Sequence, residues 1–318
     1  MRDSWPDLTA KVEPAHARAL RVVADAAAQV GVDWFLVGAL ARDWLLQGLH
    51  GVPTQRATTD ADIAVALPDW PAFESVKLGI VNSGEFLAHP RVTHRLDHVR
   101  LPGFHLDLVP FGAIAGTHAT IAWPPAHAVV MNVIGYTDAL AGAITLRVAA
   151  DLSIRVASVS GLTLLKLFAW QDRHLESSKD AWDLRLLLTR YEAAGNRERI
   201  YDEGVMEAEG FDAERAACRL LGRDVARLVA APTRASLLAL LDHQLQMSSA
   251  AGLIEDMAYV RPDGAIRAGS RFDGGAAIEQ ARTCRACANS AAMRCRATSS
   301  RSPCRRRSLW NFRVRANT

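Results

Sequence analysis

The chain has 318 residues, of which 50% are hydrophobic and 22% are charged, and its formal net charge is +3. This composition is ordinary for a globular protein, and the length allows a large core and a second domain. No uninterrupted apolar run reaches about 18 residues, and the N-terminus lacks the apolar segment of a signal peptide. We therefore expect a cytoplasmic protein that does not span a membrane.

Charge and cysteine are unevenly distributed along the chain. Residues 281–318 contain ten arginines, no lysine and no acid, so the remainder carries a net charge of −7. Four of the five cysteines lie in this tail, and only Cys218 lies outside it. This excludes a disulfide framework for the fold. The tail shows neither helical nor strand periodicity and resembles the product of an altered reading frame, so we expect disorder there.

The N-terminal segments predict a helix, a strand and a second helix. Residues 14–30 have apolar side chains at helical spacing, with a proline in the first turn and Gly31 at the end. Residues 34–37 form a short apolar run that suits a buried strand, and Gly38 opens a helix over residues 39–49. A strand, a glycine and a helix start in succession direct free backbone N–H groups toward an anion.

Two carboxylates, Asp60 and Asp62, lie on a predicted strand over residues 60–67. Alternate strand residues point to the same side, so the pair can bind a metal ion together. Asp107 alternates with apolar residues on another predicted strand and would complete a cluster suited to hard divalent cations. Asp-x-Asp alone is a weak signal, because a solvated strand edge has the same pattern. The preceding strand–glycine–helix segment favours a functional site.

The rest of the chain divides into an irregular β-rich part and a helical part. A helix is expected from residue 70 to about residue 81, and residues 92–154 have the short alternating segments of antiparallel strands. Four helical patterns follow, over residues 161–170, 179–191, 213–229 and 234–247. We expect a mixed α/β catalytic domain over residues 1–157, a helical domain over 158–252, and a poorly ordered tail over 253–318.

Two segments together resemble the signature of the polymerase-beta-type nucleotidyltransferase superfamily. They are Val37-Gly38-Ala39-Leu40-Ala41-Arg42-Asp43 and Thr59-Asp60-Ala61-Asp62-Ile63. Within that superfamily the chain is most similar to the AbiEii/AbiGii-type toxin nucleotidyltransferases, over roughly residues 33–191. The resemblance implies an α/β (α+β) fold with a mixed sheet flanked by helices.

The resemblance also implies roles for individual residues. Asp60 and Asp62 would hold two Mg²⁺ ions, for which Mn²⁺ could substitute, and Asp107 would bind metal and activate the acceptor hydroxyl. Gly38 would face the triphosphate of a nucleoside triphosphate. Ala39 stands where many members have serine or a second glycine, which removes one phosphate contact but leaves the backbone N–H groups.

Two further cations and their acidic neighbours are candidates for nucleotide binding. Lys166 interrupts an apolar helical run, so it either extends from the edge of the helix to solvent or points into a site. The resemblance favours the site and implies that Lys166 contacts the phosphates, oriented by Asp180 or Asp183. Arg42 could contact a phosphate or base, or could form an ordinary salt bridge.

The leading hypothesis is an enzyme that transfers a nucleoside monophosphate from a nucleoside triphosphate to an acceptor hydroxyl. By resemblance to the toxin family, the acceptor would be RNA, for example a tRNA 3′ end, and the setting a toxin with a cognate antitoxin. A CCA-adding-like enzyme is an alternative, although the Arg-Arg-Asp-Phe-Thr-Ile-Asn-Ala segment usual in those enzymes is missing. A small-molecule, antibiotic-type acceptor is a third possibility, and a non-catalytic module that binds a nucleotide or a partner is a fourth.

Overall fold

The computed structural model describes residues 5–54, 58, 60–127, 129–246 and 252–258, and it confirms the expected mixed α/β fold class. The arginine- and cysteine-rich tail over residues 281–318 lies outside the described residues. Within the described part of the chain, no helix combines the length and the apolar character that crossing a membrane requires.

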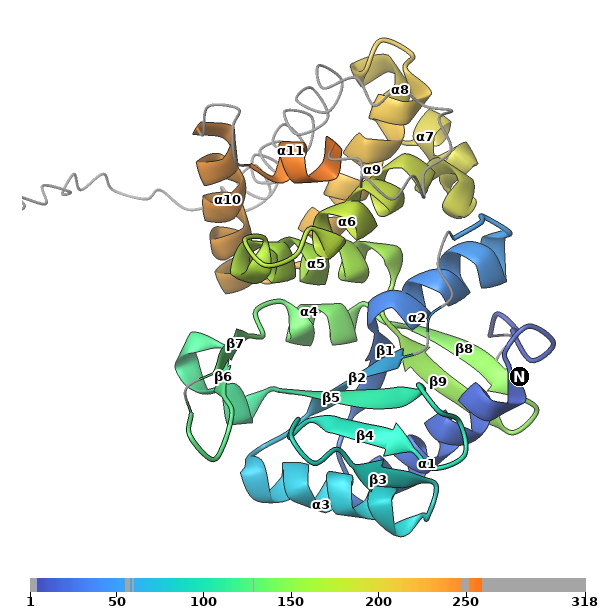
Figure 1. Ribbon diagram of the computed structural model, residues 1–318. Coiled ribbons are helices and arrows are strands. Elements are labelled where there is room, and N and C mark those ends of the chain that lie inside the picture. Colours follow the sequence, from blue (N-terminus) through green and yellow to red (C-terminus); the bar gives the residue numbers. More distant parts are fainter. Residues whose placement is uncertain (1–4, 55–57, 59, 128, 247–251, 259–318) are drawn as a thin grey trace, which may run out of the picture.

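A seven-stranded mixed sheet forms the centre of the N-terminal half (Figure 1). Its strands, in the order in which they are paired, are β3 (Phe86–Ala88), β4 (Arg95–His98), β5 (His105–Phe111), β2 (Asp60–Ala66), β1 (Trp34–Val37), β9 (Leu152–Val156) and β8 (Ile144–Ala149). The pairs β2–β5 and β1–β9 are parallel, and the other four pairs are antiparallel. A separate hairpin pairs β6 (Thr120–Ala122) with β7 (Val130–Asn132).

Helices cover both faces of this sheet. Figure 1 shows α1 (Pro14–Val30) and α3 (Trp70–Asn82) on one face. On the other face lie α2 (Gly38–Asp43), its π-helical continuation η1 (Trp44–Leu49), and α4 (Tyr136–Ala141). The predicted helices over residues 14–30 and 39–49 are therefore present. The short α4 lacks a clear sequence pattern because six residues give too few turns to show periodicity.

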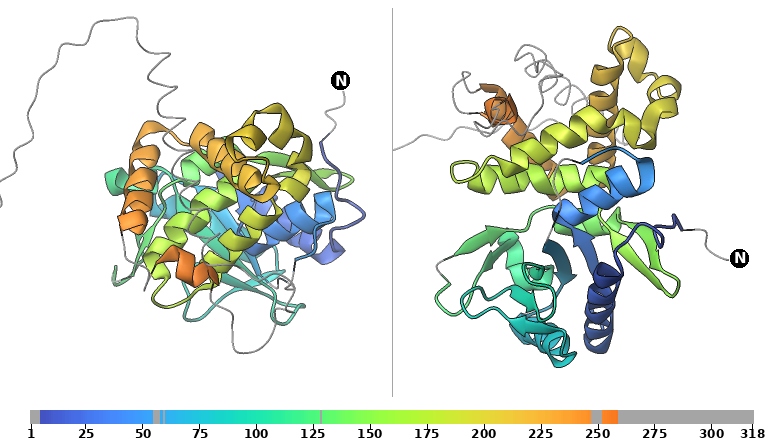
Figure 2. Two further views of the ribbon diagram at one scale, coloured as in Figure 1. Left: turned by 90° about the horizontal axis from the view of Figure 1, so that it is seen from above. Right: turned by 45° about the vertical axis from the view of Figure 1, so that its right-hand side comes forward.

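The helical half stacks on the side of the sheet that carries α2 and α4 (Figures 1 and 2). Its long helices match the four predicted patterns: α5 (Val159–Arg173), α6 (Lys179–Arg190), α9 (Ala213–Leu228) and α10 (Ala231–Gln246). Shorter elements that the sequence patterns do not predict connect them or follow them: η3 (Glu192–Asn196), α7 (Arg197–Asp202), α8 (Val205–Ala208) and α11 (Leu253–Ala258). A further short helix, η2 (Ala113–His118), lies between β5 and β6.

Helix α5 belongs to two hydrophobic cores. Leu162 and Leu165 pack with the buried residues of the sheet and its helices. Leu164 and Phe168 pack with those of the helical half. A Ser158 side chain caps the start of α5 by accepting a bond from the Gly161 N–H at 3.2 Å. The predicted boundary near residue 158 thus coincides with the start of a helix that packs against both halves.

The ordered chain extends beyond the predicted end of the helical domain at residue 252. Leu253 and Met257 of α11 are buried in the second core. Trp170 Nε1 of α5 donates a hydrogen bond to Asp256 Oδ2 at 2.7 Å. Six residues were too short a segment to predict as a helix, and their contacts come from chain far away in sequence.

A buried carboxylate on α4 fixes the start of α10. Asp138 is buried and accepts hydrogen bonds from the Ala230 N–H at 2.7 Å and from Thr233 Oγ1 at 2.6 Å. The interaction joins a helix on the sheet to a helix of the helical half. The two bonded residues, 138 and 230, are 92 positions apart in the sequence.

We predict that Asp138→Ala lowers the free energy of unfolding by about 1–3 kcal/mol, because it leaves a buried backbone N–H without its acceptor. Thr233→Ala, which leaves the bond to Ala230 in place, should lower it by less. Urea unfolding followed by circular dichroism measures both. Equal losses in the two variants would show that the backbone bond is not the stabilising one.

Candidate active site

The three predicted metal-binding carboxylates lie on one face of the sheet. Asp62 of β2 is paired in register with Asp107 of β5, and these strands are parallel, so the two side chains point to the same side. Asp60 precedes Asp62 by two strand positions and shares that face. The structure therefore brings together three residues that are up to 47 positions apart in the sequence.

The environment of Asp62 disfavours its ionised form. Burial is the largest cause, followed by the negative charge of Asp60, and together they raise the pKa of Asp62 to about 7. Asp107 acts in the same direction, while the positive charges of Lys166 and Arg173 act against it. The face that carries these carboxylates is thus directed toward cations of α5.

Gly38 makes the close approach of α2 to Asp62 possible. Its φ is +71°, and a β-carbon built on it would lie 1.8 Å from Asp62 Oδ2. No side chain fits there without displacing the carboxylate. The resemblance implies that Gly38 faces the triphosphate. The structure adds a second reason for glycine at this position, which is its contact with Asp62. Ala39 follows it in the first turn of α2.

Asp107 is bound by an arginine from the neighbouring strand. Arg95 Nε and Nη2 donate to its two carboxylate oxygens at 2.8 and 2.7 Å. Arg95 is in register with Asp107 across the β4–β5 pair, which explains the bidentate geometry. Within the described ranges, no three acid, histidine or cysteine side chains are close enough to surround a metal ion.

The donor set nevertheless fits a hard divalent cation. Asp60, Asp62 and Asp107 supply only carboxylate oxygens, which is the ligand type that Mg²⁺ and Mn²⁺ prefer. Burial, and then the negative charges of Asp60 and Asp107, raise the pKa of Asp62, and a nearby cation would oppose this shift. Arg95 occupies both oxygens of Asp107, so this carboxylate would have to exchange at least one arginine contact for a metal contact.

Lys166 is held by two carboxylates of α6. Its Nζ lies 2.8 Å from Asp180 Oδ1 and 2.6 Å from Asp183 Oδ2. Burial alone would lower the pKa of Lys166, but Asp183 and Asp180 outweigh it and raise that pKa, so the ammonium group stays charged. The lysine does not extend to solvent from the helix edge, since its side chain is only 16% exposed. It is an oriented cation, as the resemblance implied.

Arg42 is part of the same network but is turned away from solvent. The residue is 6% exposed. Its Nε and Nη2 donate to Asp43 Oδ1 at 2.9 and 2.7 Å, and Nη1 donates to Asp183. Thr58 Oγ1 donates to the other Asp43 oxygen at 2.6 Å. This geometry favours the salt-bridge alternative for Arg42, with a part in positioning Asp183 and hence Lys166.

Arg173 and Tyr136 also lie at the site, and the sequence motifs gave neither residue a role. Arg173 lies seven residues after Lys166 on α5 and donates to both oxygens of Asp180, at 2.6 and 3.0 Å. Tyr136, at the start of α4, is close enough to Asp62 and Arg173 for their charges to act on it. Burial, and then the charge of Asp62, raise the pKa of Tyr136, so its hydroxyl stays protonated. The i, i+7 spacing of Lys166 and Arg173 was a readable sequence signal, whereas nothing in the sequence singles out Tyr136.

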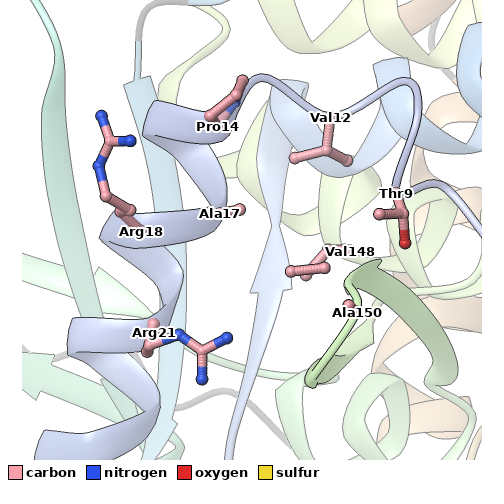
Figure 3. A pocket seen from close by; sticks show the side chains of 9 residues that line it. Thr9, Val12, Pro14, Ala17, Arg18, Arg21, Val148 and Ala150 are labelled. Carbon is pink, nitrogen blue, oxygen red and sulfur yellow. The ribbon is translucent and has the colours of Figure 1, made fainter.

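The structure also has an open cavity of about 300 Å³ elsewhere. Figure 3 shows it between the start of α1, with Arg18 and Arg21, and the end of β8, with Val148 and Ala150 nearby. In the sheet, β8 is separated from β2 by β1 and β9. This cavity shares no residue with the carboxylate face, and its lining offers no acid–base or metal-binding group.

The arrangement therefore combines acidic and basic groups in the way that phosphoryl chemistry requires. Carboxylates that can bind metal lie on the sheet, and cations that can bind phosphates lie opposite on α5. Of the predicted site residues, Asp60, Asp62, Asp107, Gly38, Ala39, Lys166 and Asp180 are gathered here, while the polar atoms of Arg42 are occupied by carboxylates.

Comparison with known proteins identifies one matching family. The sequence profile described as "Nucleotidyl transferase AbiEii toxin, Type IV TA system" matches residues 21–273. That range includes the carboxylate strands, α5, α6 and the helical half. No curated protein matches the chain.

Several solved structures of nucleotidyltransferases are similar at low identity. The lincosamide antibiotic adenylyltransferase LnuA, bound to lincomycin, has 19% identity over 54% of this chain and 94% of its own, with a TM-score of 0.32. A CCA-adding enzyme in complex with ATP has 12% identity over 92% and 85%, with a TM-score of 0.32. The Thermotoga maritima CCA-adding enzyme complexed with tRNA has 13% identity over 91% and 85%, with a TM-score of 0.24.

We predict that Gly38→Ala destabilises the protein well beyond the penalty for a left-handed backbone. Gly31→Ala is the matched control, because Gly31 has φ +74° and nothing within 4 Å of a built β-carbon. The control should cost about 1 kcal/mol and Gly38→Ala more than about 2 kcal/mol, measured by urea unfolding. In an Asp62→Ala background most of the excess cost should disappear, because only the β-carbon of residue 62, at 3.0 Å, remains close. Equal costs for the two glycines would refute the contact.

We further predict a pH-dependent gain in stability for Asp62→Asn in the presence of EDTA. The folded-state pKa of Asp62 is raised from 3.8 to about 7, so the folded protein binds more protons than the unfolded chain between these values. Wild-type stability therefore falls as the pH rises through this window, and the variant escapes that loss. Thermal melts should show no difference near pH 4 and a gain of about 1–3 kcal/mol near pH 8. A difference that is constant with pH would contradict this.

Proposed function

Because the chain belongs to the AbiEii family of nucleotidyltransferases, we propose that it transfers a nucleoside monophosphate from a nucleoside triphosphate to an acceptor hydroxyl, releasing pyrophosphate. Nucleotidyl transfer is the activity of the family. We further propose an acceptor, a metal requirement and a biological role.

One observation supports the proposal most directly. The carboxylates Asp60, Asp62 and Asp107 share one face of the sheet, and the oriented ammonium group of Lys166 is close enough to act electrostatically on Asp62. A site that only bound a partner would not need two acids placed so that their charges act against the ionisation of a third, Asp62. A degenerate, non-catalytic member would be expected to lack at least one of them.

Each group has a distinct part in the proposed reaction. Asp60, Asp62 and Asp107 would hold two Mg²⁺ ions, which supply phosphate charge neutralisation and a lower pKa for the attacking hydroxyl when bound. Lys166 binds phosphate oxygens and keeps its charge because Asp180 and Asp183 hold it. Gly38 leaves room for the backbone of α2 to approach both Asp62 and the nucleotide. Asp107 would also activate the acceptor hydroxyl, once a metal contact replaces a contact with Arg95.

The proposed acceptor is RNA, with a tRNA 3′ end as the first candidate, and the proposed setting is a cytoplasmic toxin–antitoxin pair. Only the toxin setting follows the family description, which names a toxin of a type IV system. The RNA acceptor is proposed from the resemblance to the toxin nucleotidyltransferases. We propose the cognate antitoxin as a functional partner.

The proposal is tested by incubating the purified protein with each labelled ribonucleoside triphosphate, Mg²⁺ and total tRNA. We expect label in RNA, and we expect Asp62→Ala to reduce it by at least about 100-fold because metal binding and charge neutralisation are lost. Asp25→Ala, an exposed acid on α1, is the control and should retain activity. Label that Asp62→Ala leaves unchanged would overturn the assignment of Asp62, and transfer only to an added aminoglycoside or lincosamide would overturn the RNA acceptor.

A further inference from the structure

Arg173 has the position and the free donors of a phosphate-binding residue. It lies seven residues after Lys166 on α5, and seven residues are close to two helical turns, so both cations project from one side of the helix. Their positive charges both act on Asp62, which places them over the same carboxylate face. Lys166 is largely buried, whereas the Arg173 side chain is 54% exposed.

Asp180 holds both cations. It is fully buried at 0% exposure, and it binds Lys166 Nζ through Oδ1 and the Arg173 guanidinium through both oxygens. A buried carboxylate needs such partners, because it is otherwise unstable as an anion. The arginine is thereby fixed in one orientation by a bidentate contact.

The contact with Asp180 uses only part of the guanidinium. Nε and one Nη2 hydrogen point to the carboxylate, and no bond from Nη1 to another residue of the described chain is present. An arginine has five N–H donors, so three remain available, and they belong to a half-exposed group. Lys166 has used two of its three donors on Asp180 and Asp183, which leaves one.

We propose that Arg173 is a second triphosphate-binding residue, which Asp180 orients together with Lys166. This inference rests on the proposed function and names a substrate contact of the same site. Planar N–H pairs of arginine match two phosphate oxygens at once, so Arg173 contributes more donors to the triphosphate than the lysine can. Asp180 thus orients two phosphate ligands, and Arg173 is the more accessible of them.

The test measures binding to inorganic tripolyphosphate and to the α,β-methylene analogues of the four ribonucleoside triphosphates. Calorimetric titrations with Mg²⁺ compare wild type with Arg173→Gln and Lys166→Ala, and nucleoside monophosphates serve as the comparison ligands. We expect Arg173→Gln to weaken tripolyphosphate and triphosphate binding by about tenfold, the usual worth of a charged hydrogen bond. Monophosphate binding should change less than twofold.

Arg227→Gln is the matched control. Arg227 on α9 is 59% exposed and also binds carboxylates, with Asp224 at 3.0 Å and Glu203 at 3.1 Å. The control should leave tripolyphosphate affinity unchanged, and its melting temperature sets the change expected from losing a half-exposed arginine. A large affinity loss in the control as well would overturn the specific role of Arg173.

Arg173→Lys separates contact with phosphate from a purely structural role. Lysine keeps the positive charge but cannot form the two-bond contact with Asp180. Partial recovery of tripolyphosphate affinity in Arg173→Lys, above the affinity of Arg173→Gln, supports direct contact, because the lysine keeps the charge but not the paired donors. An affinity as low as that of Arg173→Gln would show that the arginine acts only by fixing Asp180.

The outcomes also separate this inference from the proposed function. Unchanged tripolyphosphate affinity in Arg173→Gln, with weaker binding in Lys166→Ala, would refute the inference and leave the enzyme assignment intact. Wild-type protein that binds neither tripolyphosphate nor any triphosphate analogue would refute both.

Discussion

The electrostatic repulsion among three carboxylates on one face of the sheet is the constraint on which the site depends. Asp60, Asp62 and Asp107 share that face because of strand alternation and the parallel β2–β5 register. The burial of Asp62, and then the charges of Asp60 and Asp107, raise its pKa to about 7. Such an arrangement lowers stability and persists only where the surrounding fold enforces it. Arg95 on one side and the cations of α5 on the other provide the opposite charge that the protein itself can supply.

Those cations are in turn held by acids of a neighbouring helix. Asp180 and Asp183 are one turn apart on α6, and each bridges two cations: Asp180 bridges Lys166 and Arg173, and Asp183 bridges Lys166 and Arg42. The network continues through Asp43 to Thr58, two residues before the carboxylate strand. Elements α2, α5 and α6 are thus connected by ion pairs around one lysine. A change at one end of this network can alter the orientation of the other end without touching the substrate.

Local patterns predicted the mixed α/β fold class and the pairing of Asp60 with Asp62, because both depend on short-range rules. The place of Asp107 beside them depends on the parallel β2–β5 register, which no local pattern determines. Strand alternation places Asp60 and Asp62 together, and the glycine motif marks Gly38. The contact partners of Arg95 and Arg42 could not be predicted, because they depend on strand register and on helix packing over long separations. Arg42 and Asp183 are 141 positions apart, and Trp170 and Asp256 are 86 apart. Short elements such as α4 and α11 escaped prediction for the same reason, since tertiary contacts rather than periodicity stabilise them.

The charge balance of the site bears on how a nucleotide enters it. Six of the residues named above are acidic, namely Asp43, Asp60, Asp62, Asp107, Asp180 and Asp183, and four are basic, namely Arg42, Arg95, Lys166 and Arg173. When all of them are ionised, the acids exceed the bases by two charges. A triphosphate adds several negative charges, and the site would repel it if no other cation were present. Divalent ions held by the acids would remove that repulsion, as the proposed reaction requires. The ion pairs between α5 and α6 hold Lys166 and Arg173 in place for the phosphates that the proposal assigns to them.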